Sequence, residues 1–330
     1  MEIQKHHRIL ITGGKGFLGT RLYNVLKHRG YEHVFAVGGT RSGTDLGEES
    51  TVGWLFQRIQ PEIVIHLAAR TGGFEASARY PGGFIYENLN MGLKVIEEAR
   101  HYNCLKFIMS APIISYPDTC PIPFKETDLW NGPPDPFLWS YGVAKRSLME
   151  LVAAYGKQFG FSATSLIFPT IYGPEDKIDP RWNRIIPDII TRVKYNIQEG
   201  TKEFPVWNHD QTSREFLYVD DAVESIIFAM EGFHGSDIIN VGNGVEVNIR
   251  DLITKVCEIM NYEGKLVWHD QPPEGQPRKY LDVSQCKQKL GFEAKTSIED
   301  GLKQTIDWVE QTRSSVMKTR KSELPNGEIV

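Results

Sequence analysis

Short apolar runs alternate with amphipathic stretches along the first half of this 330-residue chain. Each run carries β-branched or large apolar residues, and a stretch with helical periodicity follows; the runs are residues 9–11, 34–37, 63–67, 106–109 and 162–168. Strands that alternate with helices in this way form a parallel sheet that is buried on both faces. The pattern therefore predicts a doubly wound α/β fold.

The alternation becomes irregular after Pro174. Residues 176–187 carry Trp and Pro, and a helix is expected from there to about Val193. Residues 214–241 are predicted to return to the first sheet, with 238–241 as one of its strands. Two more helices are expected, at 248–261 and at 297–312, where Ser297 is followed by two acidic residues in the first turn.

Composition is that of an ordinary globular protein, with 41% hydrophobic and 24% charged residues. The net charge of −5 argues against a nucleic-acid-binding surface. No apolar run approaches the roughly 20 residues of a membrane span, and no signal peptide is evident. The four cysteines lack metal-binding spacing, so they are expected to be reduced, in a cytoplasmic protein without a metal site.

A glycine cluster follows the first apolar run directly, in Ile9-Leu-Ile-Thr-Gly13-Gly-Lys-Gly16-Phe-Leu-Gly19. A helical pattern begins at Phe17 and continues to about Lys27. Glycines at this spacing between a strand and a helix permit a tight turn and the close approach of a pyrophosphate to the helix N-terminus. The motif predicts a dinucleotide site in the first strand–turn–helix unit.

A tyrosine and a lysine lie four positions apart, at Tyr141 and Lys145, at the start of a stretch with helical periodicity. On a helix these side chains share one face. A phenol with its usual pKa of about 10 exchanges protons poorly at neutral pH. A neighbouring ammonium is expected to lower that pKa toward working pH, which makes the pair a candidate acid–base centre.

Together the two motifs resemble the extended short-chain dehydrogenase/reductase superfamily, and the resemblance covers nearly the whole chain. Further matches are His66-Leu-Ala-Ala69, Asn88, Tyr172-Gly-Pro174 and residues 214–221. A narrower resemblance, to the GDP-L-fucose synthase family, rests on residues 72–73, 116–117, 131–134, 206–207, 275–279 and 281–282. Members of that family epimerise and then reduce a GDP-4-keto-6-deoxy sugar.

The resemblance implies a Rossmann-type doubly wound parallel sheet with a smaller C-terminal α/β substrate domain. Residues 1–174, with 214–241 returning to them, are assigned to an NADP-binding domain. Residues 175–213 and 242–313 are assigned to the substrate domain, which would bind a nucleotide sugar. The mixed charged, Ser, Pro and Gly residues of 314–330 predict a disordered tail.

The end of the second strand favours NADP(H) over NAD(H). A carboxylate there would accept hydrogen bonds from the adenosine ribose, but the chain continues Val37-Gly-Gly-Thr-Arg41-Ser42 with no carboxylate until Asp45. Arg41 and Ser42 are therefore expected to bind the 2′-phosphate of NADP. The resemblance extends the expected cofactor-binding set to Gly13, Gly16, Phe17, Leu18, Gly19, Asp45, Leu46, Leu67, Ala68, Ala69, Asn88 and Lys145.

The resemblance also implies a third catalytic residue, a hydroxyl at the end of the strand 106–109, where Ser110 stands. Ser110 would bind the substrate oxygen while Tyr141 passes the proton, and Lys145 would also hold the nicotinamide ribose. The chain from Ser110 to Tyr116 is two residues longer than the family pattern, so Ser115 stays open as an alternative.

Two positions depart from the GDP-L-fucose synthase pattern. That family has a cysteine two residues beyond the catalytic serine and a histidine just before the next Ile-Ile-Pro segment. The cysteine and the histidine act as base and acid that exchange protons at C3 and C5 of the sugar. Here Pro112 and Arg184 stand at these positions. Neither side chain exchanges protons at neutral pH, so the sequence predicts a reductase without epimerase activity. Cys120, eight residues beyond Pro112, is left open as a replacement base.

The favoured hypothesis is an NADPH-dependent C4-ketoreductase of a nucleotide-diphosphate 4-keto sugar, with GDP as the expected nucleotide. Alternatives are an NAD-dependent 4-epimerase or 4-dehydrogenase, a bifunctional epimerase/reductase of the GDP-L-fucose synthase type, and a non-catalytic dinucleotide sensor. The expected substrate-binding residues are Arg184, Val206, Trp207, Arg214, Arg278 and Lys279, with Arg214 and either Arg278 or Lys279 on the diphosphate. The resemblance implies a homodimer formed through residues 88–101 and 141–156 of each subunit.

Overall fold

The computed structural model describes residues 2–38, 44–72, 74–136, 138–176, 178, 184–207, 210–270 and 276–312. The side chains of residues 74, 75 and 207 are outside this description. Arg41 and Ser42 and the predicted tail at 314–330 also lie outside the described residues.

Six parallel strands form the central sheet, which confirms the predicted fold class. In spatial order they are β2 (Val34–Val37), β1 (Ile9–Thr12), β3 (Ile63–His66), β4 (Lys106–Pro112), β5 (Ala163–Phe168) and β9 (Ile238–Asn240). Strand β4 is longer than the apolar run 106–109, because its pairing with β5 continues from Phe107 to Pro112. Ser110 and Pro112 therefore lie inside a strand.

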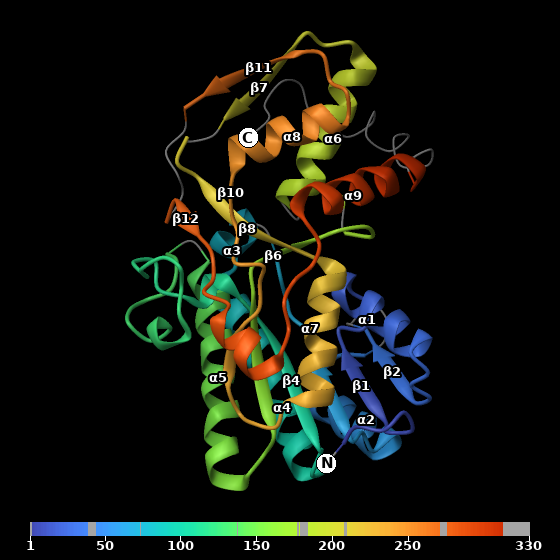
Figure 1. The fold of residues 1–330 in the computed structure, drawn as a ribbon. Helices are drawn as coiled ribbons and strands as arrows, with labels where there is room; N and C mark the ends of the chain where they lie inside the picture. Colours follow the sequence, from blue (N-terminus) through green and yellow to red (C-terminus); the bar gives the residue numbers. More distant parts are fainter. Residues whose placement is uncertain are drawn as a thin grey trace.

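Helices cover both faces of this sheet (Figure 1). One face packs on α2 (Glu49–Ile59), α4 (Pro81–His101) and α5 (Trp139–Phe159), and the other on α1 (Phe17–His28) and α7 (Val219–Gly232). The short α3 (Phe74–Arg79) precedes α4. Side chains alternate along each strand between the two apolar clusters, which is the pattern of a sheet buried on both faces.

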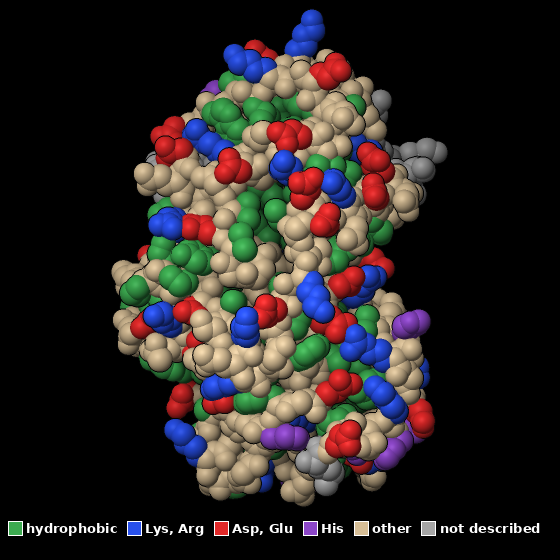
Figure 2. Space-filling model, in the orientation of Figure 1, with side chains coloured by type: hydrophobic (Ala, Val, Ile, Leu, Met, Phe, Trp, Pro, Cys, Tyr) green, Lys and Arg blue, Asp and Glu red, His purple; other side chains and the backbone are tan. Residues whose placement is uncertain are grey.

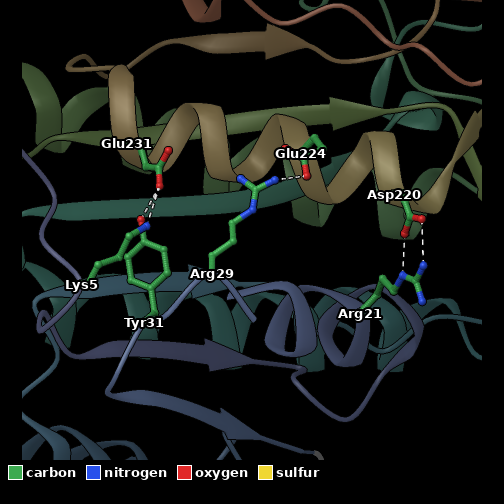
Figure 3. Close-up of polar contacts among 7 residues, drawn as sticks. All are labelled: Lys5, Arg21, Arg29, Tyr31, Asp220, Glu224 and Glu231. Carbon is green, nitrogen blue, oxygen red and sulfur yellow. Dashed lines mark hydrogen bonds and ion pairs between the residues drawn. The ribbon is translucent and has the colours of Figure 1, made fainter. Parts of the chain in front are cut away.

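Polar contacts join α7 to α1 and to the chain on either side of α1 (Figure 3). The guanidinium of Arg21 donates to both carboxylate oxygens of Asp220, at 2.5 and 2.8 Å. One helical turn further along α7, the Glu224 carboxylate accepts a hydrogen bond from the Arg29 guanidinium. These pairs are partly exposed, so we expect them to set the orientation of α7 more than to stabilise the fold.

The remaining elements pack around a third apolar cluster, above the central sheet in Figure 1. Strands β6 (Thr170–Tyr172), β10 (Glu246–Asn248) and β12 (Arg278–Lys279) each pair with β8 (Ser213–Tyr218), and β7 (Glu203–Trp207) pairs with β11 (Lys265–His269). Helices α6 (Ile185–Glu199), α8 (Ile249–Ile259) and α9 (Ile298–Thr312) surround them. Single turns occur at η2 (Ile113–Ser115), η3 (Glu126–Asp128) and η5 (Cys286–Leu290).

The face drawn in Figure 2 carries both charge signs interspersed, without a large area of one sign. Within the described ranges, we find no helix that is both long enough and apolar enough to cross a membrane.

Candidate active site

The glycine loop between β1 and α1 leaves no room for side chains. Gly13 has φ +71°, and a Cβ there would lie 2.6 Å from the backbone nitrogen of Ala68. A Cβ on Gly19 would lie 2.3 Å from the carbonyl oxygen of Gly13, so the first turn of α1 packs directly on the loop. Each distance is shorter than a side-chain carbon tolerates. The loop therefore needs glycine at both positions.

The N-terminus of α1 is open. Its N-cap residue, Gly16, has no side chain to accept the first backbone N–H groups, and the first turn contains no acidic residue. Phe17 and Leu18 begin the helix beside Gly16. An uncapped helix N-terminus next to a narrow glycine loop is a site for a phosphate group, because unsatisfied N–H groups and the helix dipole both attract an anion. The geometry fits the pyrophosphate of a dinucleotide.

The neighbouring loop, residues 67–70, is fixed by Asn88 from α4. Its amide nitrogen donates to the carbonyl oxygens of Arg70 and Phe84, at 3.0 and 2.7 Å, and its oxygen accepts from the Arg70 nitrogen. Asn88 is buried and its polar atoms are used within the protein, so it fixes the Arg70 end of the loop that contains Leu67, Ala68 and Ala69. These three residues are half-buried at the end of β3, beside Gly13.

Asp45 and Leu46 lie beyond the end of β2. Leu46 is buried in the apolar cluster under α2 and α4, and exposed Asp45 accepts from the Gly47 nitrogen at 2.8 Å. Lys94 and Asn90 of α4 hold the Gly47 carbonyl oxygen. The turn is therefore attached to α4.

Helix α5 carries Tyr141 in its first turn and Lys145 in its second. The helix approaches η2 closely because Gly142 lacks a side chain, and a Cβ there would lie 2.9 Å from the Ile114 carbonyl oxygen. The Lys145 nitrogen lies 5.9 Å from the centre of the Tyr141 ring. The predicted pair is thus on one helix face, beside the segment that follows β4.

Burial sets the protonation of this pair. It lowers the pKa of Lys145 to about 8, and the buried ammonium has no hydrogen-bond partner among the described residues. Burial raises the pKa of Tyr141, and the positive charge of Arg184 opposes this rise. The expectation that the tyrosine pKa falls toward working pH was wrong for this structure, because desolvation of the phenolate outweighs the charge of Arg184. Tyr141 is therefore a protonated phenol at neutral pH.

The hydroxyl candidates differ in environment. Ser110 is half-buried in β4, opposite Leu166 of β5, and shares its strand face with Pro112. Ser115 is fully buried in η2, and its carbonyl oxygen accepts from Arg146. Ser110 is therefore the more accessible of the two hydroxyls. It alternates with Met109 and Ala111 of the cluster under α5, so its side chain leaves β4 on the other face of the sheet.

Comparison with known proteins gives the family of the chain. A family model described as the NAD dependent epimerase/dehydratase family matches residues 9–242. The chain belongs to this family. It is 33% identical over 306 residues to a putative GDP-L-fucose synthase 2 of Arabidopsis thaliana, covering 93% of this chain and 92% of the relative. The GDP-L-fucose synthase of Escherichia coli is 31% identical, with 91% of this chain and 96% of the relative covered.

A solved structure adds to the family assignment. It is a GDP-mannoheptose C4 reductase from Campylobacter jejuni with NADP bound, and it matches with a TM-score of 0.85 and 25% identity. The match covers 93% of this chain and 99% of that one. Family membership and this likeness confirm the Rossmann-type architecture and the resemblance to nucleotide-sugar enzymes.

Of the predicted substrate residues, Arg184 is the one that lies beside the start of α1. It precedes α6, lies 5.9 Å from the Phe17 ring and donates to the Ile171 carbonyl oxygen at 3.3 Å. A 3.6 Å ion pair joins it to buried Asp176. Its positive charge opposes the rise of the Tyr141 pKa.

Arg214 and Lys279 come together as opposite residues on the paired strands β8 and β12. The buried Lys279 ammonium donates to Asp135, and an Arg214 nitrogen donates to the carbonyl oxygens of Ser213 and Pro277 at 2.7 and 2.6 Å. Arg278 is on the other side of its strand, exposed and bound to both carboxylate oxygens of Glu246 at 2.6 Å. Of the alternatives left open, Lys279 is therefore the one beside Arg214.

The remaining predicted site residues either pack in the hydrophobic core or have side chains that the structure does not describe. Val206 is buried in the third apolar cluster, and the side chain of Trp207 is not among those described. Cys120 is buried in the cluster under α5, where desolvation raises its thiol pKa to about 12. A thiol in this state is not available as a base. The described residues contain no cluster of three or more His, Cys, Asp or Glu suited to a metal.

Sequence reasoning missed two residues that organise the site. Asp135 neutralises Lys279 from 144 positions away, a separation that leaves no local pattern to read. Arg146, next to Lys145, donates to the carbonyl oxygens of Ser115 and Gly132 and so holds both loops against α5. The sequence could have indicated Arg146, because it is a charged residue on the face of a predicted helix that is expected to be buried.

Proposed function

We propose that this protein is an NADPH-dependent C4-ketoreductase of a nucleotide-diphosphate 4-keto sugar, GDP-linked, without 3,5-epimerase activity. The observation that carries the proposal is the intact Tyr141–Lys145 pair beside a strand that continues Ser110-Ala-Pro112, with the charge of Arg184 acting on the tyrosine. Relatives that are GDP-L-fucose synthases and a structural neighbour that is a GDP-mannoheptose C4 reductase support the substrate class.

In this mechanism each residue has a separate task. Ser110 binds the C4 carbonyl oxygen of the sugar, and Tyr141, a protonated phenol, donates its proton to that oxygen. Lys145 and the positive end of α5 stabilise the phenolate that remains, since Tyr141 lies in the first turn of the helix. NADPH, held at the glycine loop and the α1 N-terminus, supplies the hydride when bound. Lys145 would also hold its nicotinamide ribose.

The proposal excludes epimerisation on chemical grounds. Removal of a proton from C3 or C5 requires a base, and its return to the other face requires an acid. Pro112 has no titratable group, and the Arg184 guanidinium does not deprotonate. Cys120, eight residues beyond Pro112, is a buried thiol with a raised pKa. The alternative of a bifunctional enzyme would need residues other than these.

For the substrate we propose that Arg214 binds the diphosphate, with Arg184 near the sugar. One nitrogen of the Arg214 guanidinium donates to backbone carbonyl oxygens, and burial lowers the pKa of the group. A bound phosphate would accept hydrogen bonds from the other guanidinium nitrogens and would stabilise the buried positive charge. Lys279, already paired with Asp135, orients this part of the site. Arg278 is not included, because it is paired with Glu246 on the surface.

The proposal is tested by incubating the protein with NADPH and a panel of GDP- and dTDP-linked 4-keto sugars. We expect one NADPH to be consumed per sugar reduced at C4, with the GDP-linked compounds preferred. NADPH oxidation by none of the panel would reject the reductase assignment. Turnover with bound NAD and no net oxidation would favour the 4-epimerase alternative.

The cofactor preference gives a separate prediction. Arg41→Ala is expected to weaken NADPH binding by about 10- to 100-fold, the value of one charge-assisted contact, because only NADPH carries the 2′-phosphate. NADH binding should change little. Fluorescence titration of both cofactors measures the difference, with Arg58→Ala on α2 as the surface control. An equal loss for the two cofactors would assign Arg41 another role.

We also propose that the enzyme is a homodimer formed through α4 and α5. On α4, Tyr86 and Leu93 are 67% and 47% exposed and lie two turns apart on one face. Along α5, a surface hollow of about 530 Å³ is lined by Val143, Ser147, Leu151 and exposed Trp130. Exposed apolar side chains on adjacent helices are typical of an interface.

Light scattering at micromolar concentration is expected to give twice the mass of the chain. Tyr86→Arg should produce a monomer, because it places a charge in the helix–helix interface. Tyr195→Arg on α6, where the tyrosine is 50% exposed, is the matched control and should stay dimeric. A monomeric unmodified protein would reject this interface.

A further inference from the structure

Several buried polar atoms are without hydrogen-bond partners among the residues the structure describes, and two of them, both nitrogen atoms, concern the proposed site. They are Nε2 of His66 and Nζ of Lys145, in side chains that are 0% and 1% exposed. Almost all buried polar groups in folded proteins are hydrogen-bonded, and each exception calls for a physical reason. One of these atoms belongs to the proposed catalytic lysine, and the other has no role in the mechanism so far.

Strand register and alternation place the His66 side chain on the face of the sheet that α5 covers. Thr12, His66 and Met109 are opposite one another on β1, β3 and β4. His66 alternates with Val64, whose side chain lies in the apolar cluster shared with α5, and the His66 ring stacks on Phe107 of that cluster. Lys145 is buried on α5, the helix that packs on this face. The lysine charge adds to burial in lowering the pKa of His66.

The other ring nitrogen of His66 is already bound. Nδ1 lies 2.7 Å from the hydroxyl oxygen of Thr12, which also accepts from the Ala68 nitrogen at 3.5 Å. An ammonium only donates hydrogen bonds, so a neutral ring stabilises Lys145 only if the nitrogen facing it is unprotonated. That condition assigns the ring proton to Nδ1, which then donates to Thr12, and leaves Nε2 as an acceptor.

We propose that His66 is a positioning residue for Lys145: Nε2 accepts a hydrogen bond from the Lys145 ammonium, directly or through one water, while Nδ1–H is anchored on Thr12. The proposal rests on the proposed function, since it concerns the lysine of that mechanism. A neutral acceptor orients the ammonium without cancelling its charge. Burial and the lysine charge both keep His66 neutral by lowering its pKa to about 3.

The arrangement would connect the cofactor loop to the catalytic helix. Thr12 ends β1, directly before Gly13, and its carbonyl oxygen accepts from the Leu67 nitrogen at 3.0 Å. The chain Ala68–Thr12–His66–Lys145 therefore runs from the loop expected at the cofactor to the ammonium that supports Tyr141. A displaced lysine would lower the rate of proton transfer while leaving the sugar site intact.

Three substitutions of His66 separate positioning from packing. His66→Asn keeps a group that reaches Thr12 but deletes the distal nitrogen. His66→Phe keeps the ring on Phe107 and deletes both nitrogens. His66→Gln retains a polar atom at the distal position. We expect kcat to fall by about 10- to 100-fold in the Asn and Phe variants. KM for the sugar and the melting temperature should change little, and His66→Gln should recover most of kcat.

Wild-type kcat in His66→Asn, or an equal loss in His66→Gln, would overturn the proposal, as would losses that follow the melting temperature. A second measurement needs no substrate: nitrogen NMR of histidine-labelled protein with NADP⁺ bound. We expect His66 as the Nδ1–H tautomer, with an Nε2 resonance that shifts in Lys145→Met. An Nε2–H tautomer, or no shift, would reject the role of His66 even if the sugar panel showed no reduction.

Discussion

Tyr141→Phe is expected to lower kcat by about 10³-fold or more, because it removes the proton that the C4 oxygen receives and changes little else. The burial that raises the tyrosine pKa keeps the phenol protonated, which is the state needed for reduction. NADPH binding should be nearly unchanged, since the ring and its helix remain. Stopped-flow measurement of hydride transfer and a titration with NADPH together test this.

A matched control is available on the same helix. Tyr155 lies near the other end of α5, where its hydroxyl donates to Glu97 of α4 at 2.7 Å. Tyr155→Phe also deletes one phenolic hydroxyl from α5, and it should leave kcat close to the wild-type value. If Tyr141→Phe kept most of the turnover, the proton would have to come from elsewhere, and Ser110 with an ordered water would become the first alternative.

The sequence was most informative where structure is local and periodic. Apolar runs predicted the strands of the central sheet, and the glycine spacing predicted the strand–turn–helix unit at Gly13. The end of β4 was less predictable, because backbone pairing with β5 continues through Ser110-Ala-Pro112 after the apolar run has ended. Hydrogen bonding between strands needs no apolar side chain, so hydrophobicity marks the centre of a strand better than its end.

Only those site residues that lie close together in the sequence could be predicted as neighbours. Tyr141 and Lys145 lie four positions apart, and one helix brings them together. The partner of Lys279 is Asp135, and the proposed partner of Lys145 is His66; both pairs depend on how distant segments pack. The tyrosine pKa depends on burial, which spacing does not report. A charge four residues away suggested a lower pKa, and desolvation gives a higher one.

The domain division and the roles of the site residues stay predictions. The structure does contain two features relevant to the division: β9 joins the six-stranded sheet beside β5, and α7 packs on α1. Both elements follow β8, so the chain passes from the second sheet back to the first before returning to α8. Arg41, which carries the cofactor prediction, lies outside the described residues.

We expect the protein to catalyse no proton exchange at C3 or C5 of the sugar, the exchange that a 3,5-epimerase requires. In D₂O, deuterium enters C3 or C5 of a 4-keto sugar only if a protein group removes and returns protons there. We expect deuterium at neither carbon above the non-enzymatic background, and one hydride at C4 per turnover. The reason is the pair Pro112 and Arg184, which offers neither base nor acid. Mass spectrometry and NMR of the reduced sugar read out both positions.

The double substitution Pro112→Cys with Arg184→His tests the same idea in reverse. It restores a thiol and an imidazole, but we expect only trace exchange, because Arg184 is bound to Asp176 and to the Ile171 carbonyl oxygen in a way that histidine does not reproduce. Misplacement of catalytic groups by about 1 Å is enough to cost about 10²-fold in rate. Rapid exchange by the unmodified protein would instead reject the reductase-only proposal. Cys120 would then be tested by Cys120→Ser, although its burial and raised pKa argue that exchange would persist in that variant.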